Sequence, residues 1–166
     1  MGRDQIQQEF LELIRENSGI IHKVCHLYRH SATDKQDLFQ EILAQLWKAF
    51  PKFRREAKIS TWMYRIGLNT AISDYRKQQR TVSLVKNPLH EAVVLFDTDT
   101  AEQKEKLTIL HQAVSKLSDI EKAVVMLYLE ERSYEEMEAV LGIGQANLRV
   151  KMNRIKEKLR KQVSQT

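Results

Sequence analysis

The sequence is poor in the residues that cross-link chains, make turns and span membranes. It has one cysteine, two prolines and five glycines among 166 residues. The single cysteine, Cys25, excludes an internal disulfide framework and a cysteine-based zinc site, and so few turn formers exclude a β-sandwich or barrel. No run of about 18 apolar residues occurs, so we expect no membrane span. The polar first ten residues lack a secretory signal, which makes a reduced, cytoplasmic protein the default expectation.

Charge is unevenly distributed along the chain. The formal net charge is +5, from 27 Lys and Arg against 22 Asp and Glu. Residues 48–80 hold nine basic and two acidic side chains, residues 91–138 hold five basic and twelve acidic, and residues 144–161 hold seven basic and one acidic. Two basic segments separated by an acidic one predict two separate anion-binding surfaces, although a basic helix face is often only solvated.

Apolar residues recur every three or four positions along most of the chain, which predicts helices. The predicted helices cover residues 5–29 (with a break at 17–19), 37–50, 61–79, 107–117, 119–128, 134–141 and 145–159. Periodicity fails over residues 81–101, which we interpret as a linker, with a short strand pair as the alternative. The sequence therefore predicts an all-α fold of two small helical modules, residues 1–80 and 102–166, joined by a flexible linker.

Local signals mark several of the helix ends. Pro51 stops the second helix, and Ser60 or Thr61 is expected to cap the third. Ser118 and Ser133 are each followed three residues later by Glu, which is the form of a capping box. These signals support the helical interpretation independently of the apolar spacing.

The last two helices have the pattern of a helix-turn-helix, in which a short helix and a glycine-containing turn precede a helix with a basic outer face. The turn is Gly142–Gly144, and Leu148 and Met152 are expected to pack the second helix inward. Glu138 departs from the pattern, because a small residue usually faces the second helix there. Its side chain either tilts the crossing or faces outward. A plain α-hairpin with a basic exposed face is the alternative.

Outward-facing residues of the last helix are the candidates for reading duplex DNA. Gln and Asn side chains pair with adenine in a bidentate way, and Arg or Lys pairs with guanine, whereas basic residues further along the helix reach phosphates. The candidate residues are Gln145, Asn147, Arg149, Val150, Lys151, Arg154 and Lys158.

The first module carries a family pattern in residues 37–47 (DLFQEILAQLW), 53–54 (FR) and 60–77 (STWMYRIGLNTAISDYRK). This pattern resembles the promoter-binding module of the extracytoplasmic-function sigma factors of bacterial RNA polymerase. Residues 117–159, with NLRVKMNR at 147–154, resemble the second, helix-turn-helix module of that family. The resemblance covers nearly the whole chain outside the linker. The departures from the family pattern are Gly67, Leu68, Ser73 and Glu138.

The resemblance implies a sigma factor that binds RNA polymerase core, at the clamp helices of the largest subunit and at the flap, and directs promoter-specific initiation. It places polymerase binding on an exposed face of helix 37–50, where acids and amides can meet basic residues of a partner helix. The residues expected at this contact are Asp37, Gln40, Glu41 and Gln45. The alternative is that these acids are only solvated surface.

The resemblance also implies that residues 53–77 open and read the −10 element of the promoter as melted strand, and that the last helix reads the −35 element as duplex. Strand opening needs cations along the backbone and a contact to an extruded base, for which Asn69 is the candidate. The residues expected at the −10 element are Arg54, Arg55, Lys58, Ser60, Thr61, Arg65, Asn69, Arg76 and Lys77.

Aromatic residues of the first module have two interpretations. Trp62, Tyr64 and Tyr75 can stack on bases of a melted strand. Trp62 lies at helical spacing with Ile66, however, which favours a place in the core, and Trp47 is expected in the core as well.

The remaining polar patterns predict neither catalysis nor a cofactor. His22, His26 and His30 stand at i, i+4 and i+8 with Cys25 among them, a spacing that can bind metal, but packed or solvated histidines are commoner. No Gly-rich phosphate loop and no nucleophile–histidine arrangement is visible. We therefore expect no enzyme activity, no cofactor and no metal site.

Two other function classes remain open from the sequence. A stand-alone helix-turn-helix repressor or activator with a dimerising first module predicts binding to palindromic duplex without polymerase. A protein-binding helical adaptor predicts no DNA function, which the two basic segments make less attractive. The resemblance adds one further partner, an anti-sigma protein that covers the same surfaces.

Overall fold

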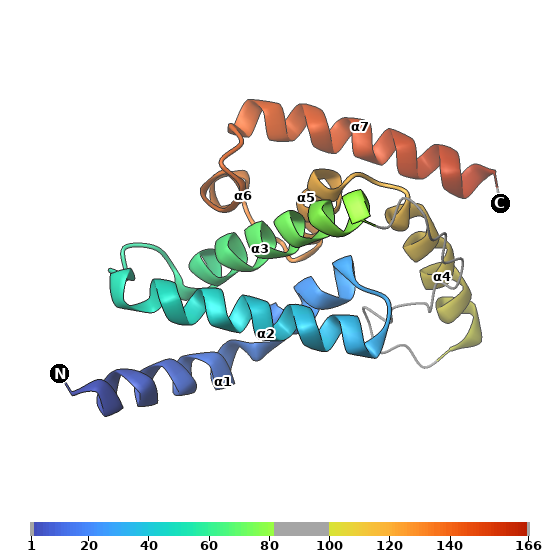
Figure 1. Cartoon of the computed structure of the whole chain (residues 1–166). Helices are drawn as coiled ribbons and strands as arrows, with labels where there is room; N and C mark the ends of the chain where they lie inside the picture. The colour runs from blue at the N-terminus through green and yellow to red at the C-terminus, as the bar shows by residue number, and fades with distance from the viewer. Residues whose placement is uncertain (1, 82–99, 166) are drawn as a thin grey trace. The chain divides into compact units, whose positions relative to one another are not determined.

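A computed structural model of the chain describes residues 2–81 and 100–165 (Figure 1). Within these residues the regular secondary structure is helical, which confirms the predicted all-α class. The chain divides into two compact units, Met1–Leu84 (unit 1) and Val85–Thr166 (unit 2). Most of the predicted linker, residues 82–99, lies outside the described residues. In the described parts of the chain, no helix is both long and apolar enough for a membrane crossing.

Unit 1 is built from three long helices. They are α1 (Arg3–Tyr28), α2 (Ala32–Ala49) and α3 (Ile59–Thr81), with a short 3-10 helix, η1 (Phe50–Lys52), after α2. α1 is kinked at Asn17, whose φ of −121° and ψ of 15° leave the helical region. The Asn17 side-chain amide donates a hydrogen bond to the Leu13 carbonyl (2.9 Å). The predicted break in the first helix is therefore confirmed.

The ends of α2 follow from local chemistry. Ser31 caps its start, where the serine hydroxyl accepts a hydrogen bond from the Asp34 N–H (3.0 Å). The α-helix ends at Ala49, because Pro51 has no N–H to continue the backbone ladder and forms part of η1 instead. The predicted stop at Pro51 is confirmed.

The start of α3 lies earlier than predicted. The helix begins at Ile59, and the Trp62 N–H donates to the Lys58 carbonyl (3.1 Å). The predicted cap at Ser60 or Thr61 is therefore wrong, since both residues lie inside the first turn. Lys58 occupies the capping position, where a side chain without an acceptor oxygen gives no sequence signal.

The apolar stripes of the three helices of unit 1 meet in a common core, because each helix packs against the other two. The most buried aliphatic residues of this core are Ile21, Val24, Leu38, Ile42, Leu46, Leu68 and Ala71. The sequence periodicity of each helix therefore marks its inward face.

Aromatic rings extend this core toward the loop that precedes α3. Phe50 meets Phe10 edge to face (5.3 Å between centroids), and Phe53 stacks on Trp62 (4.5 Å). Trp62 is 8% exposed, which confirms its predicted place in the core. The same prediction for Trp47 is wrong: its ring contacts the Phe10 ring (5.0 Å) but remains 39% exposed.

Gly67 of α3 faces both α1 and α2. A Cβ atom at this position would lie 3.7 Å from Val24 Cγ2 and 3.8 Å from Ile42 Cγ2, which are ordinary contact distances. Because alanine favours a helix over glycine, Gly67→Ala should raise the free energy of unfolding of unit 1 by about 0.5–1 kcal/mol. Urea unfolding followed by tryptophan fluorescence measures this, since Trp47 and Trp62 are the two tryptophans of the chain and both lie in unit 1. A less stable variant would contradict these distances.

Unit 2 is built around its last helix. Its helices within the described residues are α4 (Ala101–Ser115), α5 (Asp119–Leu129), α6 (Tyr134–Leu141) and α7 (Gln145–Ser164). α7 packs against the other three, and the buried residues at these contacts include Val124, Leu127, Met137, Leu148 and Ile155. α4 begins earlier than predicted because Thr100 caps it, with its hydroxyl accepting from the Gln103 N–H (3.3 Å).

Ser118 and Ser133 both cap their helices as predicted, and the capping box is complete at Ser118. The Ser118 hydroxyl accepts a hydrogen bond from the Glu121 N–H (3.2 Å), and the Glu121 carboxylate accepts from the Ser118 N–H (3.5 Å), which completes a capping box. The Ser133 hydroxyl accepts from the Glu136 N–H (3.1 Å) and begins α6. These caps fix the starts of α5 and α6 and thereby the entry to the helix-turn-helix.

Candidate nucleic-acid interface

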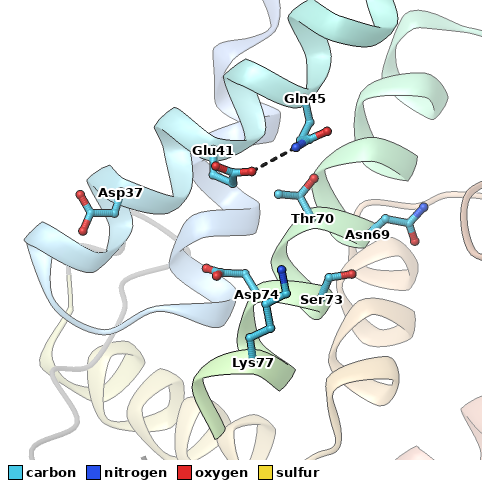
Figure 2. A pocket seen from close by; sticks show the side chains of 8 residues that line it. All are labelled: Asp37, Glu41, Gln45, Asn69, Thr70, Ser73, Asp74 and Lys77. Carbon is cyan, nitrogen blue, oxygen red and sulfur yellow. Dashed lines mark hydrogen bonds between the residues drawn. The ribbon is translucent and has the colours of Figure 1, made fainter. Parts of the chain in front are cut away.

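A polar groove of about 610 Å³ lies between α2 and α3 of unit 1. Figure 2 shows that side chains of both helices border it. The lining residues are Asp37, Glu41, Gln45, Asn69, Thr70, Ser73, Asp74 and Lys77. Residues that the sequence assigns to polymerase and residues that it assigns to the −10 element therefore share one groove, a proximity that the sequence does not predict.

The α2 side of the groove carries negative charge. Asp37, Glu41 and Gln45 follow one another at intervals of four residues; the two acids are exposed and Gln45 is half-buried. The Gln45 side-chain amide donates a hydrogen bond to the Glu41 carboxylate (3.1 Å; Figure 2). We call these three residues the α2 rim. Gln40 is exposed on α2 but does not line the groove.

The α3 side of the groove carries Lys77, the acid Asp74 and neutral polar groups, and Arg65 continues the same helix face beyond the groove. Arg65, Asn69, Ser73 and Lys77 are all exposed and recur every four residues, so they form one stripe along α3. We call these four residues the α3 stripe. Ser73 is the member that the sequence analysis did not predict, and its spacing from Asn69 is the signal that could have found it. The side chain of Arg76 lies outside the described ones.

A buried ion pair joins the end of α1 to α3 beside the groove. Arg29 is 4% exposed, and its Nη2 donates to the Asp74 carboxylate, while its Nη1 donates to the Tyr28 carbonyl (2.9 Å). Asp74 is 36% exposed and faces the groove. The sequence analysis missed this pair, because 45 positions separate its members and no local pattern links them.

The loop between η1 and α3 presents the predicted basic residues to solvent. Arg54, Arg55 and Lys58 are exposed. Arg55 has a φ of 56°, in the left-handed region that costs a non-glycine residue about 1–2 kcal/mol. Thr61 is 6% exposed and lies below this surface, and Ser60 is half-buried.

Tyr64 does not fit its predicted stacking role. Its side chain is 1% exposed and belongs to the core of unit 1, so it offers no face to a base. The predicted stacking by Tyr64 is therefore wrong, because the ring is buried. The side chain of Tyr75, the other predicted stacking residue, lies outside the described ones.

Unit 2 contains the predicted turn between α6 and α7. Gly142 has a φ of 70°, and its N–H donates to the Glu138 carbonyl (2.8 Å), which closes the end of α6. Only glycine adopts this left-handed conformation without strain, and α7 begins at Gln145 directly after Gly144. The predicted turn is therefore confirmed.

The packing of α6 on α7 follows the predicted helix-turn-helix pattern. Leu148 and Met152 are buried on the inner face of α7, as expected. Glu138 is exposed, so of the two outcomes foreseen for it, the outward-facing one holds. Met137 and Val140 are the buried residues of α6, which explains why a glutamate at position 138 is tolerated.

The opposite face of α7 holds the predicted DNA-reading residues. Asn147, Arg149, Val150 and Arg154 are exposed, whereas Gln145 and Lys151 are half-buried. Asn153 is exposed as well, four residues after Arg149 and beside Arg154, so it belongs to the same face. The sequence analysis left Asn153 out, although the interval of four residues would have found it.

Lys158 is held within unit 2. Its Nζ lies 2.8 and 2.9 Å from the two oxygens of the Glu121 carboxylate, so α7 is joined to the start of α5. Burial alone raises the pKa of Glu121, but the hydrogen bonds from Lys158 and Ser118 together outweigh it, so the pKa lies below its ordinary value. Lys158 therefore has an internal partner that the sequence analysis did not foresee.

The lowered pKa of Glu121 predicts a dependence of unit 2 stability on pH. A carboxyl group with a lowered folded-state pKa stabilises the fold above its unfolded pKa, about 4.3, and loses that effect as pH falls through the folded value. We expect unit 2 to lose stability below about pH 4.3 and Glu121→Gln to lose less over the same range. Amide hydrogen exchange of α5 and α7 in the full chain measures both. Equal losses in the two proteins would contradict this origin.

The two histidines of α1 differ in exposure, because His22 is exposed and His26 is half-buried. The His22 ring stacks on Phe39 (4.8 Å between centroids), and burial is the largest cause that lowers the pKa of His26. Cys25 is buried, and burial raises the pKa of its thiol to about 11. Among the described residues, no group of three His, Cys, Asp or Glu side chains is arranged to hold a metal ion.

Two family descriptions match the chain, one in each unit. Sigma-70 region 2 matches residues 13–81, which contain α2, α3 and the groove between them. Sigma-70, region 4 matches residues 107–159, which contain the helix-turn-helix. The order of the two matches along the chain is the order of the two surfaces described above.

Individual proteins match along nearly their full lengths. The ECF RNA polymerase sigma factor SigW of Bacillus subtilis (strain 168) is 24% identical over 168 residues, which covers 95% of this chain and 90% of that protein. The RNA polymerase sigma factor YlaC of the same organism is 27% identical over 171 residues, which covers 99% of this chain and 95% of that protein.

Solved structures share the fold at low identity. CnrH in complex with the cytosolic domain of CnrY matches with a TM-score of 0.68 and 20% identity, over 95% of this chain and 89% of that chain. The sigma factor RpoE in complex with the anti-sigma factor NepR from Bartonella quintana matches with a TM-score of 0.70 and 18% identity, over 96% and 97%.

Proposed function

Because the chain belongs to the extracytoplasmic-function sigma factors of the sigma-70 family, we propose that its two units divide promoter recognition between them. As a sigma factor, the chain binds RNA polymerase core and directs promoter-specific initiation. Unit 1 holds the polymerase and reads the −10 element as a single strand, and unit 2 reads the −35 element as duplex. The observation that carries this proposal is the exposed row of basic and polar side chains at helical spacing on one helix of each unit.

The α2 rim is the proposed contact with the clamp helices of the largest polymerase subunit. Its acids are exposed and stand one helical turn apart, so they can pair with basic side chains that repeat at the same interval on a partner helix. Negative charge on this side of the groove also repels phosphates, which leaves the α3 side to the DNA.

The α3 stripe and the loop before it are the proposed −10 surface. Arg54, Arg55 and Lys58 track the phosphates of a melted strand, while Asn69 offers both a donor and an acceptor to an extruded base. Ser73 and Lys77 continue the surface along α3. Trp62 and Tyr64 are part of the core and support this surface from below rather than stack on bases.

The exposed face of α7 is the proposed −35 surface. The helix begins with no acidic residue in its first turn, so the partial positive charge of its N-terminus is available to the DNA. Among the exposed candidate residues, Asn147 and Arg149 stand closest to that end and are assigned to base edges, with Asn153 on the same face. Arg154 lies further along and is assigned to a phosphate. A contact of the same unit with the polymerase flap belongs to the proposal as well.

Connection of the two units strengthens both contacts. Once one unit is bound, the other is confined near its own element, so the second contact forms at a high effective concentration. Each unit can therefore bind weakly on its own while the pair selects a promoter. The proposal assigns no reaction to this chain, because the polymerase performs the chemistry.

An anti-sigma protein is a further proposed partner. The sigma factor RpoE, one of the structural matches, was solved in complex with the anti-sigma factor NepR, and CnrH was solved in complex with the cytosolic domain of CnrY. A protein that covers the α2 rim would keep this chain from the polymerase. A cytoplasmic location is part of the same proposal, since polymerase and chromosome are there.

Directed cleavage by a tethered iron chelate tests which target each of the three proposed surfaces contacts. Cys25 is the single cysteine of the chain, and its burial and raised pKa keep it from reacting with a thiol label. An introduced surface cysteine is therefore labelled selectively. Three variants place the chelate on the three surfaces: Gln40→Cys on α2, Ser73→Cys on α3 and Ala146→Cys on α7.

The three labelled proteins should cut different targets when bound with polymerase core to a promoter fragment. We expect the chelate on α2 to cut the largest polymerase subunit, on α3 the −10 element and on α7 the −35 element. Glu12→Cys, on the exposed face of α1, is the control and should cut neither promoter element. Cleavage of the same DNA positions from α3 and from α7 would contradict the proposal.

A further inference from the structure

We propose that Tyr134 positions Arg149 to read a guanine of the −35 element, an inference that rests on the proposed function of α7. Tyr134 is the first residue of α6, and Arg149 lies in the second turn of α7. The Arg149 Cζ lies over the Tyr134 ring, 4.9 Å from its centroid, which is a cation–π contact. The two residues come from the two helices of the helix-turn-helix, so the contact links the supporting helix to the reading helix.

The nature of this partner leaves Arg149 able to bind a base. A guanidinium carries five N–H donors in its plane, and an aromatic ring attracts it without accepting hydrogen bonds along that edge. In the part of the chain that the structure describes, Arg149 makes no ion pair. A bidentate contact to O6 and N7 of guanine needs two of those donors. The ring therefore orients Arg149 without competing with the base.

Two other cations of unit 2 are held by carboxylates. Lys158 pairs with Glu121, and Arg132 pairs with Glu136, whose carboxylate lies 3.4 Å from the Arg132 Nη1. Glu136 follows Tyr134 by two residues, so a carboxylate stands close in sequence to the ring and yet binds another cation. These carboxylates therefore bind other cations, and Arg149 contacts an uncharged ring, as does Lys156, whose Nζ lies 4.8 Å from the centroid of the Tyr128 ring.

The ring itself is well placed to act as a support. Ser133 caps α6 directly before Tyr134, which fixes the backbone of the first turn. Tyr134 is half-buried, whereas Arg149 is exposed. An exposed arginine loses rotamer freedom when it binds DNA, and a contact that already restricts it in the unbound protein reduces that loss.

The test compares variants in the complete holoenzyme. The probe is a promoter fragment identified by mapping transcript starts after overexpression of the chain. Holoenzyme affinity is measured for this fragment and for fragments in which each base pair of the −35 element is replaced in turn. Arg149→Ala should abolish discrimination at one G·C pair. Tyr134→Leu should reduce discrimination at the same pair by about 2–5-fold, the size of an exposed cation–π contact.

Conservative variants test whether Tyr134 orients Arg149 or only stabilises the fold of unit 2. Tyr134→Phe keeps the ring and should discriminate like the wild-type protein, and Tyr134→Trp should do so at least as well. The double variant with Arg149→Ala and Tyr134→Leu should discriminate no worse than Arg149→Ala alone. The salt dependence of binding, which counts phosphate contacts, should be the same for all Tyr134 variants.

Each contrary outcome has a distinct meaning. Unchanged discrimination in Tyr134→Leu, or a loss in Tyr134→Phe or Tyr134→Trp, overturns this inference while the proposed function of α7 stands. An additional loss in the double variant overturns it in the same way. Unchanged discrimination in Arg149→Ala overturns the proposed reading by Arg149 itself, and the inference with it.

Discussion

Asp74→Ala should lower the free energy of unfolding of unit 1 by about 3 kcal/mol, because it leaves the Arg29 guanidinium buried without its carboxylate. Arg29 is 4% exposed, and the Tyr28 carbonyl accepts a hydrogen bond only from its Nη1, so Nη2 loses its carboxylate acceptor. The partial exposure of Asp74 places the effect at the lower end of the range for a broken buried pair. Urea unfolding followed by tryptophan fluorescence measures the loss in the full chain.

A double variant provides the control for this prediction. Arg29→Met with Asp74→Leu removes both charges and fills a similar volume, so it should recover most of the stability that Asp74→Ala loses. Two results would contradict the account: an Asp74→Ala variant as stable as the wild-type protein, or a double variant less stable than Asp74→Ala. Either would mean that the pair is not what holds the end of α1 against α3.

Reversing the charge of the α2 rim should weaken binding to RNA polymerase core by about 100-fold. The double variant Asp37→Lys with Glu41→Lys places two cations where basic partner residues are expected, and like charges at an interface cost several kcal/mol. Fluorescence anisotropy of the labelled chain against purified core, at low and at moderate salt, measures the affinity. The salt dependence should reverse its sign in the variant, because attraction has become repulsion.

A matched charge reversal on α1 distinguishes the loss of the α2 rim contact from a general effect of changing the net charge. Glu12→Lys with Glu16→Lys changes two exposed acids of α1 and gives the same total charge. This control should bind core with nearly wild-type affinity. If both double variants weaken binding equally, the α2 rim is not the contact and the assignment of Asp37 and Glu41 fails. Circular dichroism checks that both variants remain helical.

Features that depend on neighbouring residues could be predicted from the sequence. The capping box at Ser118 and the left-handed Gly142 are local chemistry, and the structure has both where the sequence places them. The start of α4 escaped prediction because Thr100 is followed by charged residues without an apolar period. The cap of α3 was misplaced because Lys58 occupies a position that favours Ser or Thr.

Features that depend on packing could not be predicted. The α2 rim and the α3 stripe are each visible as intervals of four residues, but only the packing of the two helices brings them to one groove. Trp47 and Tyr64 show the same limit, since their spacing allows burial and exposure alike. The Arg149–Tyr134 contact required the angle between α6 and α7, which no sequence interval encodes.

Single-round transcription with purified components tests the central claim most directly. RNA polymerase core alone, core with the full chain, and core with the Asp37→Lys, Glu41→Lys variant are each given a linear fragment that carries a mapped promoter. The account predicts a single transcript with a defined start when the wild-type chain is present, and almost none in the other two reactions. A chain that binds the fragment by itself but leaves the transcripts of core unchanged would contradict it and point to a stand-alone DNA-binding regulator.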